Sequence, residues 1–515
     1  MSKLETPFFD FSHAKLLENL ECVPLSLLAS LRSISKVKVV SFLLGLTLMF
    51  LITASYILTW DSKGLHFTAP PLQLRPVVIP TSTVAPELSS EKNFIDMKLQ
   101  VKSISSKAEY TPRKMPDEKD IIGTDSHLFS VIPRQFLPGI KNPCWHEEFS
   151  TKTNFDPYRG NLFTTHKSFK TASDYLRTKF QEHLYHRDGK QYRLRCLPYF
   201  YIIGQPKCGT TDLFNRLLLH PEVKFIALKE PHWWTRKRFG YIRFKGGSQE
   251  YFSVEDYLDL FDLAAHNIQE GLIGNSSRDH TKLQLITGDA SASTMWDNEA
   301  WSYLHADREE TEPPFLTQDF IHTVQPNAKI IIILRDPVER LYSEYLYFKM
   351  ANKSAEDFHQ KVTESVRLFQ SCLSERSLRS CVYNTSLSHA MLVRLHLGVY
   401  FVFLLDWLTV FHREQILVLR LEDYSANLKV TMKKVFDFLG AGPLSEQVEA
   451  QLTKRPLSNT RRAADRSLGP MLPATRDLLR EFHQPFNLKL ASVLDNKSFL
   501  WTEEIWMDER TTGAR

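Results

Sequence analysis

The stretch YIIGQPKCGTTDLF, Tyr201 to Phe214, decides the fold class, because it has the pattern of a strand, a tight turn and the start of a helix. This is the outline of a phosphate-binding loop of the P-loop type. A Walker A loop places its lysine after the second glycine, directly before Ser or Thr. Here Lys207 comes before Gly209, and no lysine follows. The stretch therefore predicts an anion site that differs from that of a nucleoside triphosphatase.

Other apolar runs predict the rest of the sheet. The candidate strands are residues 198–204, 223–228, 283–288, 329–335 and 415–420, with amphipathic stretches such as 211–220 and 254–266 between them. This alternation predicts an α/β domain in which helices flank both faces of a parallel sheet. Active sites of such sheets lie beyond the carboxyl ends of the strands, where Lys207, Asp289 and Arg335 fall. The apolar run 397–411 is short and contains Asp406, which favours a buried helix over a membrane span.

The N-terminal region predicts a single-pass type II membrane protein. Residues 39–60 carry no charge over about the length that spans a bilayer. Basic residues precede them, so residues 1–38 are expected to be cytoplasmic. A cleaved signal peptide is the alternative, which the late start and the length of the run disfavour. A disordered stem rich in Pro, Ser and Thr is expected over 61–125, a lumenal domain over 126–500 and a tail over 501–515.

The net charge and the cysteines limit which partners and which cellular compartment the sequence predicts. The net charge is +5, from 64 basic and 59 acidic residues in 515, which is too small to predict nucleic-acid binding. A lumenal compartment would permit disulfides, with Cys372–Cys381 as one candidate pair and Cys144–Cys196 as a second, although the sequence leaves the connectivity open. It also leaves open whether the chain forms a homo-oligomer. The candidate N-glycosylation sites are Asn275, Asn352, Asn384 and Asn496.

Two segments predict a site for a ligand with two separated anionic groups. In the first, Gly209 lets backbone N–H groups approach an anion, and Thr210 and Thr211 add hydroxyls at the positive end of a helix. In the second, RDPVERLYS, Arg335 ends a strand and Ser343 lies two turns into a helix. An arginine and a hydroxyl so placed can hold a second phosphate, although Arg335 could instead pair with a neighbouring acid. A nucleoside triphosphatase would need metal-binding residues that this pattern lacks.

A third segment, KEPHWWTRKRFGYIRFK, predicts the acceptor side of a transfer reaction. Glu230 follows a candidate strand and could take a proton from a hydroxyl group, with His232 assisting. The residues that follow alternate basic and aromatic side chains, which suits an anionic sugar chain. A solvated basic face beside buried tryptophans is the alternative. The candidate substrate-binding residues are Trp233, Arg236, Lys237 and Arg238.

Together these motifs resemble the Golgi carbohydrate sulfotransferases. QPKCGTT is similar to their 5′-phosphosulfate motif, including Cys208, for which no separate role is derived, and RDPVERLYS is similar to their 3′-phosphate motif. The resemblance implies the sulfotransferase fold, with 3′-phosphoadenosine 5′-phosphosulfate as donor and no obligatory metal. It also implies that Glu230 is the catalytic base, that Lys207 acts on the leaving group, and that Arg466, in the segment 461–470, contacts the nucleotide.

Three longer blocks, EPHWWTRKRFG, GDASASTMWDN and EPPFLTQDFIH, resemble the branch of this family that sulfates the 6-hydroxyl of N-acetylgalactosamine 4-sulfate. They imply an enzyme of the Golgi membrane that acts on chondroitin and dermatan sulfate and forms 4,6-disulfated units. The alternatives are a sulfotransferase for another glycan and a membrane-anchored glycosaminoglycan-binding protein without turnover. An ATP-dependent kinase is a weaker alternative.

Overall fold

The computed structural model describes residues 110–149, 156–225, 228–240, 250–273, 280–304, 312–348, 353–458 and 460–502. The expected cytoplasmic tail, the expected membrane span, most of the expected stem, Asn275 and Asn352 lie outside these ranges. None of the helices in the described ranges is long and apolar enough to cross a membrane. The apolar run 397–411 contains helix α17, Tyr400–Leu408, which is buried in the core as expected.

A four-stranded parallel sheet forms the centre of the domain and confirms the predicted architecture. Its strands are β4 (Phe200–Gly204), β5 (Gly288–Asp289), β6 (Lys329–Leu334) and β7 (Ile416–Arg420), in the order β5-β4-β6-β7. Alternate side chains of β6 enter two different hydrophobic clusters: Ile330 and Ile332 join one, Ile331 and Ile333 the other. Both faces of the sheet are therefore buried, which explains the continuous apolar runs in the sequence.

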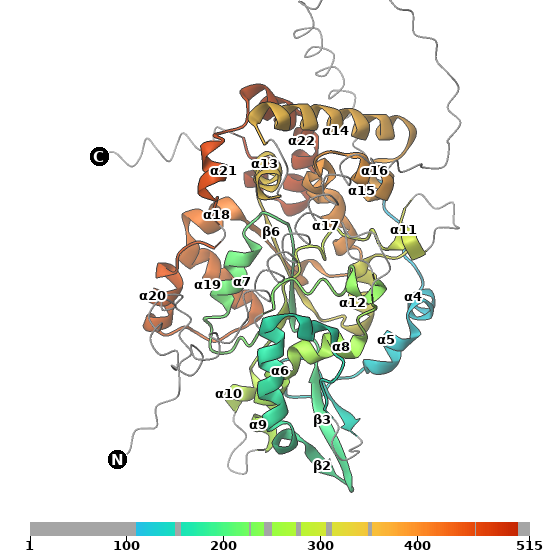
Figure 1. Cartoon of the computed structure of the whole chain (residues 1–515), viewed down its shortest axis with the longest axis vertical. Helices are drawn as coiled ribbons and strands as arrows, with labels where there is room; N and C mark the ends of the chain where they lie inside the picture. Colours follow the sequence, from blue (N-terminus) through green and yellow to red (C-terminus); the bar gives the residue numbers. More distant parts are fainter. Residues whose placement is uncertain are drawn as a thin grey trace, which may run out of the picture. The chain divides into compact units, whose positions relative to one another are not determined.

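Different helices cover the two faces of this sheet. One face packs against α7 (Thr210–Leu217) and α19 (Leu428–Leu439). The helices α13 (Pro337–Tyr347), α14 (Ala355–Glu375), α17 and α22 (Pro473–Leu494) contribute side chains to the cluster on the other face. Figure 1 shows α14 and α22 at one end of this domain and strands β2 and β3 at the other. The central sheet lies between these two ends, so its strand ends are framed by helices.

Two of the five candidate strands are largely wrong. In the run 223–228, Val223 makes an isolated bridge to Ile286, and residues 226–227 are not described. In the run 283–288, helix α10 (His280–Leu283) ends at the first residue, and β5 begins only at Gly288. These segments lie at the edge of the sheet, where β5 pairs with only two residues of β4. Their apolar side chains are buried at that edge without a continuous ladder, and an apolar run alone does not distinguish the two cases.

The structure also contains a second, antiparallel sheet that the sequence did not predict. It consists of β1 (Cys144–Phe149), β2 (Tyr185–Arg187) and β3 (Lys190–Cys196), in the order β1-β3-β2. Its strands are rich in charge, and Arg195 is fully buried because Asp259 accepts a hydrogen bond from its Nη1 at 2.6 Å. A buried charged side chain of this kind needs a partner, and here the partner comes from a distant segment. From the sequence alone, these charged strands are therefore indistinguishable from a solvent-exposed segment.

Both predicted disulfides are confirmed. Cys144 and Cys196 are bonded and are direct partners in the register of β1 and β3. Cys372 and Cys381 are bonded and join the end of α14 to α15, Leu378–Tyr383. The first bond connects two strands that are remote in sequence, whereas the second closes a short loop.

The folded domain begins before the predicted end of the stem at residue 125. The guanidinium of Arg113 donates to the carboxylate of Asp319 at 2.7 Å, and the Tyr110 hydroxyl donates to Asp406 Oδ1 at 2.8 Å. Helix α4, Glu118–Thr124, then packs near α12, Thr317–Val324. Asp319 and Asp406 are buried carboxylates that need such partners, and a polar composition does not reveal this.

The predicted C-terminal tail also starts inside the fold. The Trp501 ring lies 5.5 Å from the Phe499 ring, centroid to centroid, and packs against the main core. Nearby Asn496 accepts a hydrogen bond from the Ser498 N–H, and Asn384 accepts one from the Leu387 N–H. These bonds use the side-chain carbonyls, and both asparagines remain candidate glycosylation sites.

Candidate functional site

The carboxyl ends of β4 and β6 open into one cleft of about 600 Å³. Residues that the sequence placed in three separate segments line it together: Lys207, Gly209, Thr210, Thr211, Glu230, His232, Arg236, Arg335 and Ser343. This is the position in which parallel α/β sheets bind their ligands. The structure therefore brings the candidate anion-binding residues and the candidate base into a single site.

The first loop requires glycine at position 209. Gly209 has φ +91°, and a Cβ atom there would lie 2.7 Å from Leu421 Cδ1. The next residue, Thr210, begins α7, so the free N–H groups of this helix start at the wall of the cleft. Cys208 does not line the cleft. Its thiol is buried in the core cluster next to α7, and burial raises its pKa to about 12, which makes it a packing residue.

Lys207 places a poorly compensated positive charge in the cleft. Its backbone has φ +67°, and its ammonium group lies 3.6 Å from the centroid of the Tyr347 ring. Burial, together with the charges of Arg335 and Arg462, lowers the pKa of Lys207 to about 8. A bound anion would relieve this repulsion, so the environment of Lys207 favours a negatively charged ligand.

The second anion-binding segment is positioned by the start of α13. Asp336 caps this helix by accepting a hydrogen bond from Val338 N–H at 2.9 Å, and Pro337 is its first residue. The Tyr400 hydroxyl donates to the carbonyl of Arg335 at 2.8 Å and fixes the end of the strand. Ser343 follows on the face of α13 that lines the cleft. Strand end and helix are thus held rigidly relative to each other.

Glu339 is a carboxylate shared by the arginines around this segment. Its carboxylate oxygens lie 3.7 Å from Arg335 Nη2, 3.9 Å from Arg461 Nη2 and 2.7 Å from Arg476 Nη1. The local pairing of Arg335 that the sequence left open is therefore present. Because Arg335 still lines the cleft, it can exchange this long contact for one with a bound phosphate.

Of the basic segment 461–470, Arg461 lines the cleft and Arg466 does not. Arg466 lies on the short helix α21, Ala463–Ser467, is exposed, and is not among the lining residues. Arg461 lines the cleft and lies over the Tyr342 ring at 5.5 Å. The segment itself was identified from the sequence, but helical geometry turns the later arginine away from the site.

Glu230 is oriented by three neighbouring groups. Its Oε2 accepts a hydrogen bond from Ala292 N–H at 2.8 Å, and Lys229 forms an ion pair with its Oε1. His232 Nε2 lies 3.6 Å from Oε2. One carboxylate of the cleft is thereby held in a single orientation, as a general base requires.

His232 is held as a neutral imidazole. Its Nδ1 shares a hydrogen bond of 2.7 Å with Ser293 Oγ, and its backbone N–H donates to Ser291 Oγ at 3.1 Å. Burial, with Arg236 and Lys229 nearby, keeps the pKa of His232 well below its usual value. It can therefore exchange hydrogen bonds with an acceptor hydroxyl or with Glu230 without adding charge.

Backbone strain marks the same cleft. Among the described residues, six that are not glycine have positive φ: Asp188, Lys207, Glu230, His232, Asp495 and Trp501. Lys207, Glu230 and His232 line the cleft, so half of the strained residues lie in one site. Such conformations cost roughly 1–3 kcal/mol each and concentrate at functional sites.

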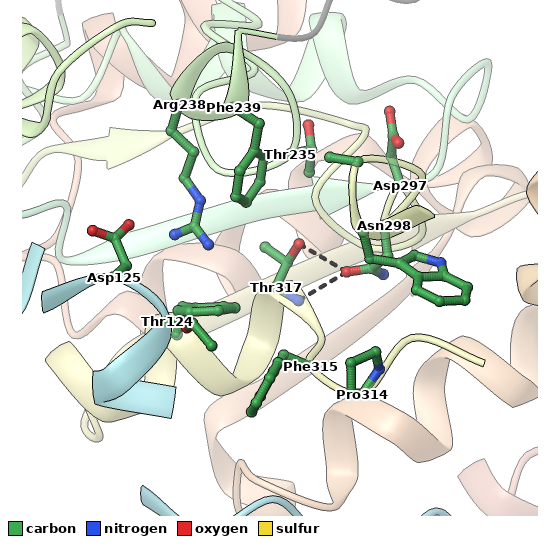
Figure 2. A pocket seen from close by; sticks show the side chains of 13 residues that line it. Thr124, Asp125, Thr235, Arg238, Phe239, Asp297, Asn298, Pro314, Phe315 and Thr317 are labelled. Carbon is green, nitrogen blue, oxygen red and sulfur yellow. Dashed lines mark hydrogen bonds between the residues drawn. The ribbon is translucent and has the colours of Figure 1, made fainter. Parts of the chain in front are cut away.

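Of the four candidate substrate-binding residues, only Arg236 lines this cleft, where its Nε donates to Asp297 Oδ2 at 2.6 Å. Trp233 is buried, and its indole N–H donates to the carbonyl of Phe252 at 2.9 Å. The ammonium of Lys237 lies 4.3 Å from the Phe163 ring, and burial lowers its pKa to about 8. Arg238 points into a separate cavity, shown in Figure 2. The alternating pattern thus divides between core, cleft and a second cavity.

Several cleft residues had no signal in the sequence. Arg394 forms an ion pair with Glu344, and its guanidinium lies 5.3 Å from the Trp296 ring. Tyr347 and Phe348 add aromatic surface at the end of α13. These residues belong to no motif and reach the site through tertiary contacts, although Trp296 lies within one of the longer blocks noted above.

Comparisons with known proteins identify the family of this chain. The sulfotransferase domain family matches residues 198–469. Carbohydrate sulfotransferase 15 of Rattus norvegicus is 53% identical over 478 residues, covering 90% of this chain and 85% of the relative, and that of Homo sapiens is 52% identical over the same coverage. A sulfotransferase structure from Alicyclobacillus acidocaldarius matches 58% of this chain and 97% of its own at 20% identity, with a TM-score of 0.37. The chain belongs to the carbohydrate sulfotransferases.

Proposed function

We propose that this enzyme transfers a sulfuryl group from 3′-phosphoadenosine 5′-phosphosulfate to the 6-hydroxyl of N-acetylgalactosamine 4-sulfate in chondroitin and dermatan sulfate. The observation that carries the proposal is the meeting of Lys207, Arg335 and Ser343 with Glu230 in one cleft. The choice of acceptor rests on the three longer sequence blocks and on the similarity to carbohydrate sulfotransferase 15 of rat and human.

The residues of the cleft suit a donor that carries an anionic group at each end. Lys207, the N–H groups at the start of α7 and the hydroxyls of Thr210 and Thr211 would hold the 5′-phosphosulfate. Arg335 and Ser343 would hold the 3′-phosphate, with Arg461 beside them. The donor supplies an activated sulfuryl group. Burial and the nearby charges of Arg335 and Arg462 lower the pKa of Lys207, and this environment fits such an anionic donor.

Glu230 acts as the general base in a single in-line displacement. It takes the proton of the acceptor 6-hydroxyl while that oxygen forms a bond to sulfur and the bond from sulfur to the bridging oxygen breaks. Lys207 and the loop N–H groups stabilise the negative charge that grows on the bridging oxygen, and adenosine 3′,5′-bisphosphate leaves. The neutral imidazole of His232 orients the acceptor hydroxyl or the Glu230 carboxylate.

A transfer assay with the full chain tests this proposal. The chain, in detergent, is incubated with labelled donor and with chondroitin 4-sulfate, unsulfated chondroitin or keratan sulfate as acceptor. We expect label in chondroitin 4-sulfate, and disaccharide analysis should show 4,6-disulfated units. Binding of adenosine 3′,5′-bisphosphate without transfer to any acceptor would instead support a glycosaminoglycan-binding protein. Transfer to keratan sulfate alone would assign the enzyme another glycan.

The proposed reaction needs no metal, because side chains and helix N–H groups supply the positive charge at the leaving oxygen. In the part of the chain that the structure describes, no group of three or more His, Cys, Asp or Glu residues is arranged to hold a metal ion. Adding EDTA to the transfer assay is expected to leave the rate within about twofold. A loss that added Mg²⁺ restores would contradict this part of the proposal.

The proposed location is the Golgi membrane, with a type II orientation and the catalytic domain in the lumen. The uncharged segment 39–60 and the basic residues before it support this proposal. Protease protection of the domain in intact Golgi vesicles would test it, and digestion without detergent would contradict it.

A further inference from the structure

A second cavity of about 270 Å³ adjoins the catalytic cleft. Two contacts form the wall between them: Thr235 Oγ1 and Ser293 Oγ lie 2.9 Å apart, and Arg236 Nε donates to Asp297 Oδ2 at 2.6 Å. Ser293 and Arg236 face the cleft, while Thr235 and Asp297 face the second cavity. The proposed reaction assigns no role to this cavity, shown in Figure 2.

Three side chains present unused hydrogen-bond donors around the cavity. Arg238 Nε and Nη1, Asn298 Nδ2 and Trp301 Nε1 are shielded from solvent and have no hydrogen-bond partner in the structure. Asn298 is only 9% exposed, and its carbonyl oxygen already accepts from the N–H and hydroxyl of Thr317 (Figure 2). Buried donors without partners are destabilising, so a cavity that collects three such side chains indicates a ligand that accepts hydrogen bonds.

The charge of Arg238 is also poorly compensated. Its guanidinium lies 4.2 Å from the centroid of the Phe320 ring and 4.3 Å from that of Phe239. Burial lowers the pKa of Arg238 to about 10, and the charge of Asp125 only partly opposes this shift. An anionic group between the rings would restore the balance, because a buried cation is stabilised mainly by a paired anion.

We infer that this cavity binds a uronate of the acceptor chain, the anionic sugar unit that lies next to the reacting hexosamine along the chain. The inference rests on the proposed function. The uronate carboxylate would accept hydrogen bonds from Arg238, while Phe239, Phe320 and Trp301 would pack against the faces of the sugar ring. Asp125 is placed to accept a hydrogen bond from a ring hydroxyl (Figure 2).

The size and position of the cavity favour one sugar unit of the acceptor chain over a separate ligand such as a nucleotide. Pockets for drug-sized ligands start at about 300 Å³, so this cavity has room for one small ring and not for a nucleotide. Its wall is shared with Arg236 and Ser293, beside the proposed acceptor end of the cleft. A hexosamine at Glu230 would therefore be separated from the cavity by this one layer of side chains.

The test compares acceptors of two lengths with three variants of the full chain in detergent. The acceptors are a chondroitin 4-sulfate hexasaccharide and a methyl glycoside of N-acetylgalactosamine 4-sulfate. Arg238→Met removes the donors, Arg238→Lys keeps the charge, and Arg376→Met removes one charge from an exposed arginine outside both cavities. Transfer rates, the KM of each acceptor, the dissociation constant of the hexasaccharide and Tm are measured.

We expect Arg238→Met to raise the KM and the dissociation constant of the hexasaccharide by about tenfold or more, as for the loss of a charged hydrogen bond. The KM of the methyl glycoside should change less than twofold. Arg238→Lys should recover part of the lost affinity for the hexasaccharide, and Arg376→Met should have the same constants as the wild type. Tm should stay or rise, because the buried cation has no paired anion in the free enzyme.

An unchanged hexasaccharide constant, an equal loss with Arg376→Met, or a fall in Tm with equal losses for both acceptors would overturn the inference. If the methyl glycoside is not turned over, the hexasaccharide dissociation constant decides alone. A wild-type chain that sulfates no chondroitin refutes the proposed function itself, which separates that failure from failure of the second site.

Discussion

The proposed donor and acceptor sides of the cleft are built in different ways. On the donor side, Lys207 and Arg335 follow the ends of β4 and β6, and Thr210 and Ser343 lie on the helices that start there. On the acceptor side, Glu230, His232, Ser293 and Trp296 lie in segments without helix or strand. The donor side is positioned by the sheet, and the acceptor side is positioned by contacts between two irregular segments.

This difference separates binding from chemistry. A rigid frame suits a donor that is the same in every turnover, and the short spacings of the donor motifs are the signature of that frame. The acceptor side holds Glu230 and His232 through hydrogen bonds with Ala292, Ser291 and Ser293, in strained backbone. Substitutions on the donor side should therefore reduce both donor affinity and the transfer rate. Substitutions on the acceptor side should reduce the transfer rate and leave donor affinity unchanged.

The largest expected effect is that of Glu230→Gln. Removing the base should lower kcat by roughly 100- to 10,000-fold, the range of general base catalysis. The dissociation constant of adenosine 3′,5′-bisphosphate should change less than threefold, because Glu230 lies on the acceptor side and is not among the residues proposed to hold the nucleotide. Steady-state transfer and calorimetric titration measure the two quantities. A variant that keeps near-normal turnover would show that Glu230 is not the base.

Lys207→Met should have the next largest effect. Loss of the cation at the leaving oxygen is expected to reduce kcat by about 100- to 1,000-fold. Unlike Glu230→Gln, it should also weaken binding of adenosine 3′,5′-bisphosphate, so the pair of variants separates the two sides. Lys207→Arg serves as the matched control that keeps the charge. Unaltered donor affinity in the Met variant would break the comparison.

The pH dependence of donor binding should report the same lysine. Lys207 is charged below its pKa of about 8 and neutral above it, so affinity for adenosine 3′,5′-bisphosphate should fall as the pH rises through that value. A bound anion favours the charged form, so binding should be accompanied by proton uptake near pH 8. The fall should be about tenfold between pH 7 and pH 9 for one group that titrates in this range.

Titration calorimetry in two buffers of different ionisation enthalpy measures both the affinity and the proton uptake. Lys207→Arg should lose the step near pH 8, because an arginine stays charged throughout this range. Persistence of the step in that variant would assign it to another group.

The smallest predicted difference contrasts two arginines of one segment. Arg461→Gln should weaken binding of adenosine 3′,5′-bisphosphate by about three- to tenfold, less than a fully buried charged hydrogen bond because its side chain is 38% exposed. Arg466→Gln should have no measurable effect, because Arg466 is exposed and does not line the cleft. Titration of both variants decides which arginine serves the nucleotide, and the reverse order would restore the assignment implied by the family resemblance.

The sequence by itself determined the parallel sheet and the donor side of the cleft. Three central strands are continuous apolar runs, and each donor motif lies at a strand end, so local pattern and position in the sheet coincide. Both disulfide pairs were also among the candidates that the sequence named. Glu230 and His232 were identified beside the donor loop, but not the strained backbone that holds them.

Only the tertiary structure decided the rest. Arg195 in the antiparallel sheet and Arg113 in the segment expected to be stem are buried because distant carboxylates pair with them, and no local pattern in the sequence indicates such a pairing. Arg236 faces the cleft, whereas Trp233 and Arg238, three and two residues away, face the core and a second cavity. Their directions depend on the path of an irregular segment between neighbours that are remote in sequence. The physical reason is that a strand or helix repeats its side-chain directions, whereas an irregular segment takes them from its contacts.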